Sequence, residues 1–304
     1  MDNRQNEVES FVGPEHIAER LKRLAPGAVV TSSGVEFLSE SYLEDNEWGV
    51  FDLTHRVYVH NTYDNFIPLI SSRDISILVT RFGRLPLFFQ VMAVRLRPGM
   101  YYQSFSIFGI LYCHQITWMV QEGTKTRVKI TWYLVSHRVL KFLHPLFSWR
   151  LRKLQNTQNL EDAPLRERRL ELRRRGVTFV TDSPDFTNAN DLCDHVILPT
   201  QQWPVRSHLP SLKDQQMVHV RLGPFELLLR REGDYLMAWP GLCPHEGALL
   251  DETHRCGDQL SCPWHGRKFR GVRLRQGEGA LRYLGLSISI QNDELIAAPE
   301  PPRQ

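Results

Sequence analysis

The feature that most constrains this chain is a pair of short cysteine and histidine segments near its C-terminus. Cys243 is followed two residues later by His245, and Cys262, after sixteen intervening residues, is followed three residues later by His265. Proline and glycine lie beside these cysteine and histidine residues in both segments, which indicates two tight loops. A zinc site with mixed ligands is the alternative, but zinc-finger patterns pair Cys with Cys and His with His. Two thiolates and two imidazoles in this order suit two iron atoms, with sulfur on one and nitrogen on the other.

These loops resemble the ligand loops of Rieske [2Fe–2S] domains. The resemblance implies that Cys243, His245, Cys262 and His265 hold the cluster, and it covers roughly residues 200–298. Short apolar runs separated by Gly-Pro and Glu-Gly-Asp turns in this region predict an all-β domain.

Four positions near the ligands refine the resemblance. Ala248 and Trp264 stand where high-potential respiratory Rieske proteins carry a pair of disulfide-forming cysteines. The loops therefore resemble the oxygenase and ferredoxin branch, whose clusters lie toward the lower part of a range of about −150 to +300 mV. Glu246 replaces the arginine usual after the first histidine, and Arg267 replaces an aromatic residue, so this chain departs from that branch beside the cluster.

A second histidine motif lies near the N-terminus and reads Asp52-Leu-Thr-His55-Arg-Val-Tyr-Val-His60. On a regular helix, positions 55 and 60 would diverge by about 140° at 3.6 residues per turn, so their imidazoles can converge only on irregular backbone. Two imidazoles and one carboxylate on one face of Fe(II) leave positions for dioxygen and substrate. Twelve histidines in 304 residues can also produce this spacing by chance.

This segment resembles the mononuclear-iron motif of Rieske oxygenases, in the form found in demethylating monooxygenases such as vanillate and dicamba demethylases. The resemblance implies that His55 and His60 are iron ligands. It also implies that Asp52 is not a ligand but hydrogen-bonds His55 and links toward a cluster histidine.

The third iron ligand is expected to be an acidic residue far downstream. Glu161 and Asp162 resemble the acidic pair that opens the last long helix in these monooxygenases, and we select Asp162. Acidic residues at a helix N-terminus are also common as caps and dipole partners, which is the alternative interpretation. Asp64, four residues after His60, is the fallback.

The segments between these motifs predict an antiparallel meander followed by a helix over Ala163–Arg175 that ends at Gly176. The predicted strands span 85–94, 101–112, 116–121 and 126–135. This order resembles the helix-grip (START/SRPBCC-like) catalytic domain, in which a curved sheet and a long helix enclose an apolar cavity. Five aromatic residues are candidates for its lining: Phe105, Phe108, Tyr112, Trp118 and Trp132. Each of them also suits an ordinary hydrophobic core.

We therefore predict an α+β chain with a helix-grip domain over 1–198 and an all-β Rieske domain over 199–304. The 304 residues suit two domains of about 150 residues each. The usual family order places the cluster domain first, so the domains are swapped here, and the proline-containing segment 195–210 is expected to connect them. Chemistry can survive the swap because sites are defined in space.

Composition indicates a soluble cytoplasmic protein. Cys113, Cys193 and Cys256 form an odd set without pairing logic, which suggests reduced thiols. The polar N-terminus lacks the apolar run of a signal peptide. The most apolar stretch, 105–120, is too short to span a bilayer.

The predicted partners follow from charge and from motifs. Residues 148–175 are rich in Arg and Lys, which usually marks a solvated helix face and can also dock an acidic electron donor. A net charge of +3 does not favour nucleic-acid binding. No nucleotide-binding glycine fingerprint is evident, so a separate NAD(P)H-dependent reductase or ferredoxin is expected.

The sequence as a whole predicts a Rieske-type terminal oxygenase, a monooxygenase rather than a dioxygenase, that uses dioxygen to hydroxylate or demethylate a hydrophobic substrate. Its cofactors would be the [2Fe–2S] cluster and a mononuclear Fe(II). By resemblance it would assemble as a head-to-tail homotrimer. The alternative is a non-catalytic Rieske electron carrier fused to a hydrophobic-ligand-binding domain.

Overall fold

The chain forms two compact units. The computed structural model describes residues 14–60, 66–72, 74–81, 88–107, 109–183, 193–199 and 203–300. Among the described residues, those up to Arg166 form the first unit, and those from Glu167 onward form the second. This division differs from the predicted boundary after residue 198, because the end of the long helix and the segment around His195 pack within the second unit.

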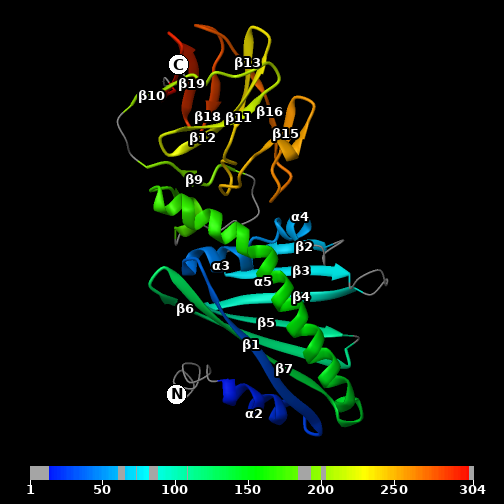
Figure 1. Ribbon diagram of the computed structural model, residues 1–304. Coiled ribbons are helices and arrows are strands. Elements are labelled where there is room, and N and C mark those ends of the chain that lie inside the picture. Colours follow the sequence, from blue (N-terminus) through cyan, green and yellow to red (C-terminus); the bar gives the residue numbers. More distant parts are fainter. Residues whose placement is uncertain are drawn as a thin grey trace. The chain divides into compact units, whose positions relative to one another are not determined.

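A seven-stranded antiparallel sheet frames the first unit (Figure 1). Its spatial order is β1-β7-β6-β5-β4-β3-β2, so successive strands from β2 to β7 are neighbours and β1 pairs with β7. The strands are β1 (Ala28–Ser39), β2 (Phe66–Ser71), β3 (Ile75–Arg81), β4 (Phe88–Arg97), β5 (Met100–Ile107), β6 (Leu111–Glu122) and β7 (Lys125–His137).

Alternating side chains turn one face of this sheet inward. On β7, Val128, Ile130 and Leu134 are buried, whereas Lys129 between them is exposed. Because strand residues two apart share a face, this period of two sets the buried face of the sheet. β6 follows the same pattern, and Leu111 and Cys113 belong to the same core.

The helices of the first unit are α2 (Pro14–Leu24), α3 (Leu43–Phe51), the single-turn α4 (Arg56–Val59), the 3₁₀ segment η2 (Arg138–Leu143) and α5 (His144–Arg174). The long helix α5 lies across the sheet (Figure 1). Its first residue, His144, is buried and contacts the hydroxyl groups of Thr31 on β1 and Ser136 on β7 at 2.8 and 2.7 Å. The start of α5 is therefore fixed to two strands of the sheet.

Two predicted elements are wrong in extent. α5 begins at His144, not at Ala163, and it continues through Pro164. A proline is favoured in the first turn of a helix, so Pro164 resembled a helix start. The predicted strand 101–112 is two strands, β5 and β6, joined by a turn in which Gly109 has φ +65°. The aromatic residues on both sides of that turn favour a strand, so the sequence predicts one continuous strand there.

The second unit is built from short antiparallel strands. β10 (Val205–His208), β20 (Glu294–Pro299), β19 (Leu286–Gln291) and β18 (Leu281–Tyr283) form one sheet. β11 (Met217–Leu222), β12 (Phe225–Glu232), β13 (Tyr235–Pro240) and β17 (Val272–Leu274) form another. Smaller pairings join β14 (Arg255–Cys256), β15 (Gln259–Ser261) and β16 (Lys268–Arg270), and β8 (Thr178–Phe179) with β9 (Val196–Ile197). The short 3₁₀ segments are η3 (Val180–Asp182) and η4 (Glu252–His254).

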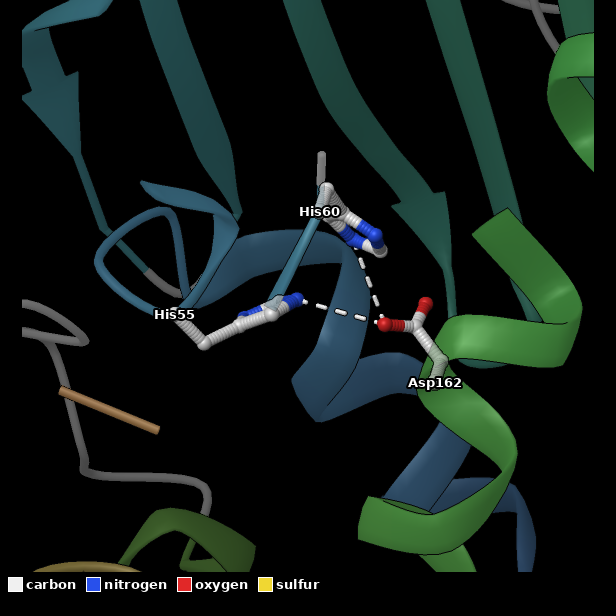
Figure 2. A group of neighbouring side chains, drawn as sticks. All are labelled: His55, His60 and Asp162. Carbon is white, nitrogen blue, oxygen red and sulfur yellow. Dashed lines mark ion pairs between the residues drawn. The ribbon is translucent and has the colours of Figure 1, made fainter. Parts of the chain in front are cut away.

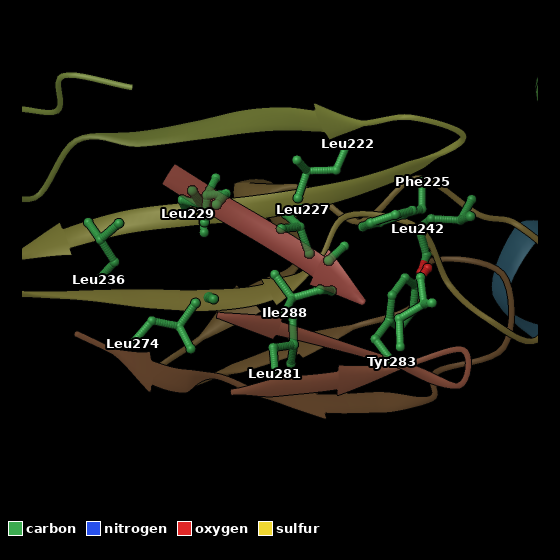
Figure 3. Close-up of a cluster of buried hydrophobic side chains, with 14 of the residues drawn as sticks. Leu222, Phe225, Leu227, Leu229, Leu236, Leu242, Leu274, Leu281, Tyr283 and Ile288 are labelled. Carbon is green, nitrogen blue, oxygen red and sulfur yellow. The ribbon is translucent and has the colours of Figure 1, made fainter. Parts of the chain in front are cut away.

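One apolar core lies between the two main sheets of this unit (Figure 3). Leu227 and Leu229 on β12 face Ile288 on β19, and all three side chains are fully buried. The predicted all-β arrangement of this region is confirmed, and with the helix-grip arrangement of the first unit it confirms the α+β class.

The prediction that residues 195–210 connect the two domains is wrong. Residues 195–210 contain β9 and β10, and each of these strands pairs within the second unit. The prolines lie beside these short strands and do not mark an independent linker. Residues 200–202 lie outside the described part of the chain.

Candidate metal centres

The first candidate centre is built on a break between two short helices. α3 ends at Phe51, His55 precedes the single turn of α4, and His60 follows that turn in an extended conformation with φ −96° and ψ 116°. Because the helix lasts only from Arg56 to Val59, the 140° divergence of a regular helix does not apply. The expected irregular backbone is therefore present.

His55, His60 and Asp162 converge on one point (Figure 2). Oδ1 of Asp162 lies 3.5 Å from Nε2 of His55 and 3.2 Å from Nε2 of His60. Asp162 projects from the interior of α5, which is a different element from the α3–α4 segment. The position of Asp162 inside the helix also removes the capping explanation for this residue. Asp64 lies outside the described residues.

Neighbouring side chains hold both imidazoles in place. Trp48 stacks on His55 with ring centroids 5.6 Å apart, and Oδ2 of Asp52 lies 3.5 Å from Nδ1 of His55. Nδ1 of His60 contacts Oε2 of Glu161 at 2.8 Å. Glu161 thus orients His60, while Asp162 faces the Nε2 atoms. The two adjacent acids therefore have different contacts. The sequence alone does not indicate which acid faces the two Nε2 atoms.

Electrostatics favour the metal-binding protonation states of His60 and Asp162. Burial works to raise the pKa of Asp162, but His55, His60 and Arg166 hold it below its usual value. Burial lowers the pKa of His60. Burial also opposes protonation of His55, but Asp162 and Asp52 outweigh it and raise that pKa. A carboxylate and at least one neutral imidazole are therefore present near neutral pH, as metal binding requires.

This arrangement fits a divalent metal ion. Both ring nitrogens of His55 and Oδ1 of Asp162 are buried and form no hydrogen bond with any described residue. Buried polar atoms normally have partners, so such atoms point to a missing ligand. Two imidazoles and one carboxylate are the donor set of non-heme Fe(II) sites.

A cavity of about 480 Å³ adjoins this centre within the first unit. His60 and Asp162 are part of its wall, and most of the remainder comes from the inward face of the sheet and from α5. Phe105 lines the cavity, as expected. Tyr112, Trp118 and Trp132 are absent from the described lining, and Phe108 lies outside the described residues.

The second candidate centre consists of two loops with the same backbone pattern. In the first loop, Gly247 N–H donates to the carbonyl of Cys243 at 2.9 Å, and Cys243 N–H donates to Ala248 at 2.8 Å. In the second, Gly266 donates to Cys262 at 2.8 Å, and Cys262 donates to Arg267 at 2.7 Å. Both glycines have positive φ, which glycine adopts without strain.

The loops bring the four predicted ligands together in a buried place. Nδ1 of His245 lies 3.1 Å from Nδ1 of His265, and all four side chains are buried. A hydrogen bond from Cys243, opposed by burial and supported by His265, lowers the pKa of Cys262 to about 5, whereas burial raises the pKa of Cys243. Two buried thiols and two facing imidazole nitrogens fit the donor set of a Rieske cluster.

A buried ionic network lies beside the first loop, and no local sequence pattern indicates it. Glu246 is 2% exposed and binds Nη1 of Arg169, which is fully buried, and Nδ1 of His195 at 2.7 Å. The rings of His195 and His245 are 4.7 Å apart. Glu246 therefore fixes the surroundings of His245, which is one of the predicted cluster ligands.

The interpretation of residues 148–175 as a solvated helix face is wrong for its C-terminal part. Nη2 of Arg168 and Nη1 of Arg175 each contact Glu226 at 2.6 Å, and Arg173 binds Asp182. These cations have internal acidic partners in the second unit.

Comparison with known families identifies the second unit. Residues 202–280 match the family model described as the Rieske [2Fe–2S] domain. The second unit contains a Rieske domain. This domain indicates electron transfer or oxygenase-type chemistry, and it confirms the predicted cluster domain.

Comparison with solved structures concerns the first part of the chain. Norcoclaurine synthase from Thalictrum flavum is 11% identical, with 46% of this chain and 87% of that chain covered and a TM-score of 0.38. An aromatase/cyclase from a Streptomyces species is 7% identical, with 47% and 96% covered and a TM-score of 0.40. A search of curated proteins found no significant match. None of the described helices is long and apolar enough to cross a membrane.

The Arg169–Glu246 pair beside the Rieske loop gives a stability prediction. Arg169→Met should lower stability by about 3–5 kcal/mol, because it leaves a buried carboxylate without its cation. Glu246→Gln should also destabilise, and the double variant Arg169→Met/Glu246→Gln should recover at least half of the summed loss. Urea titration followed by cluster absorbance measures all four proteins. Additive losses in the double variant would show that the pair is not coupled.

Proposed function

We propose that this protein is a Rieske-type terminal oxygenase. The first unit binds a hydrophobic substrate beside a mononuclear Fe(II) held by His55, His60 and Asp162. The cluster held by Cys243, His245, Cys262 and His265 receives electrons from a separate reductase or ferredoxin in the cytoplasm. Dioxygen is used to hydroxylate or demethylate the substrate, as in a monooxygenase.

One observation carries this proposal: Nε2 of His55, Nε2 of His60 and Oδ1 of Asp162 meet at the wall of a cavity. An electron carrier has no need for an open metal site at a ligand cavity. Fe(II) bound there would supply positions for dioxygen and substrate side by side. The apolar residues of the wall would limit the access of bulk water to the reacting atoms.

The surrounding residues have separate tasks in this proposal. Asp52 accepts the backbone N–H of Thr54 at 3.0 Å, which fixes its carboxylate close to Nδ1 of His55. It would orient the His55 ring and link toward a cluster histidine. Glu161 orients His60 in the same manner. Removing either contact should alter ligand orientation more than it alters the charge of the metal site.

The metal content distinguishes an oxygenase from an electron carrier. Anaerobically purified protein supplied with Fe(II) should hold three irons per two labile sulfides. His60→Ala and Asp162→Ala should each lower this to two irons, with the visible cluster spectrum unchanged. Iron and labile-sulfide analysis measures the ratio.

Two control variants sharpen this measurement. His114→Ala changes a half-buried histidine of the same unit that contacts Tyr102, and it should retain all three irons. Asp52→Asn should keep most of the third iron while slowing electron transfer from the cluster. A ratio of one iron per sulfide in the wild-type protein, unchanged by His60→Ala, would support the carrier fused to a ligand-binding domain.

The proposed assembly is a head-to-tail homotrimer in which electrons pass from one subunit's cluster to its neighbour's iron. The edge strand β2 exposes Ile67, Leu69 and Ile70, and such apolar side chains at a sheet edge support burial against another copy.

Mixed trimers test this electron path. A subunit with His245→Ala and a subunit with His55→Ala are each expected to be inactive alone. Co-expressed in equal amounts, they should recover about a quarter of the wild-type oxygen uptake with a surrogate ferredoxin and reductase, because one in four neighbouring pairs is productive. A monomer by light scattering with full oxygen uptake, or mixtures no better than either parent, would contradict the trimer.

A further inference from the structure

The cavity of the first unit has both apolar and polar lining residues, and three of its glutamines are linked by hydrogen bonds. Gln103 on β5 and Gln115 on β6 are direct cross-strand partners, and Gln155 comes from α5. All three line the cavity. Much of the wall around them is apolar, including Phe105, Ile107, Leu111, Met119, Ile130 and Leu134.

The three amides form a hydrogen-bonded relay. Nε2 of Gln115 donates to Oε1 of Gln103 at 2.5 Å and to the hydroxyl of Thr117 at 3.4 Å. Oε1 of Gln115 accepts from Nε2 of Gln155 at 3.4 Å. Gln115, which is 4% exposed, therefore uses both donor hydrogens and its carbonyl, so its amide is held in one orientation relative to its neighbours.

The two ends of the relay retain hydrogen-bonding capacity. The NH₂ group of Gln103 and the carbonyl of Gln155 form no hydrogen bond with any described residue. A concerted reversal of all three amides would exchange donor and acceptor at the ends, but it would still leave one of each. The relay thus offers a donor and an acceptor to whatever fills the cavity.

Helix geometry places this relay at a distance from the metal centre. Gln155 and Asp162 are seven residues apart on α5, which is about 10 Å along the axis and nearly the same face. A ligand oxygen at the relay would leave an apolar part of the same molecule near Asp162. The acidic residue Asp162 belongs to the metal centre. Of the four cavity-lining cations, Arg150 and Lys153 are solvent-exposed. Arg56 and Arg166 are half-buried and bind protein oxygens, Arg56 the carbonyl of Val50 and Arg166 the carbonyl and side chain of Asn159.

We infer that Gln103, Gln115 and Gln155 recognise an uncharged oxygen, a carbonyl or a hydroxyl, on an extended and largely apolar substrate. The relay holds that oxygen about two helical turns from the iron site, so that a carbon distant from it is the one presented for oxidation. This placement relative to iron rests on the proposed function, but the recognition of the oxygen does not. A substrate without the oxygen leaves the ends of the relay desolvated and unpaired.

Equilibrium binding tests the inference without turnover. The probes are 9-fluorenone, 9-hydroxyfluorene and fluorene, which share one tricyclic frame, and binding is read as displacement of Nile red under anaerobic conditions. The wild-type protein should bind each oxygenated probe about 10-fold more tightly than fluorene. Gln115→Met, which keeps the length of the side chain, should remove this preference by weakening the oxygenated probes about 10-fold and leaving fluorene unchanged.

Further variants keep the test decisive. Gln155→Met, at a half-buried position on α5, should weaken the preference even if Gln115→Met fails to fold. The matched control Lys153→Met removes a charged lining residue outside the relay and should change none of the three affinities. Equal binding of fluorene and fluorenone, or equal loss of both in Gln155→Met, would overturn the inference. Tight binding of fluorene-9-carboxylate alone, abolished by Lys153→Met, would overturn it in favour of a cationic anchor.

The result is separable from that of the iron analysis. A protein with only two irons per chain can still prefer fluorenone through the relay, which would leave a ligand-binding role. A protein with three irons and no preference would retain the proposed oxygenase and lose the relay as its specificity element.

Discussion

The arrangement of the first unit depends on one carboxylate, Asp162, that faces two imidazoles from another part of the chain. A largely buried carboxylate in the helix interior would be costly without opposite charge or a cation nearby. His55 and His60 can both reach it because α4, the helix between them, lasts only one turn. The position of α5 is fixed in turn by His144, whose ring contacts β1 and β7. Sheet, helix and broken turn are thus all required to bring three donor atoms within 4.8 Å of one another.

In the Rieske unit, by contrast, all four predicted ligands lie in two short loops. Each loop repeats the same two backbone hydrogen bonds around a cysteine and a positive-φ glycine. Next to the predicted ligand His245, the carboxylate of Glu246 binds Arg169 and His195. Such a buried pair is weak evidence for stability by itself, since desolvation offsets much of the attraction. It does fix the side chains around His245, which gives the network a positioning role.

Sequence patterns predicted local chemistry better than long-range packing. The two Cys/His loops and the His55–His60 spacing could be interpreted because each lies within a few residues. The start of α5 could not, because Pro164 imitates a helix N-terminus and the true start depends on contacts of His144 with distant strands. Arg169 lies 77 residues from Glu246, and nothing in either local segment indicates that they meet. The choice of Asp162 over Glu161 came from resemblance, and the structure gives the two acids distinct contacts.

The central claim is that a mononuclear iron and a substrate share one cavity. Nitric oxide bound to Fe(II) gives an S = 3/2 electron paramagnetic resonance signal that reports directly on an open iron position. The account predicts this signal in the wild-type protein with an oxidised cluster, its loss in Asp162→Ala, and a change in its shape when fluorenone fills the cavity. No such signal in iron-loaded wild-type protein, or a signal that persists in Asp162→Ala and ignores the ligand, would contradict the account.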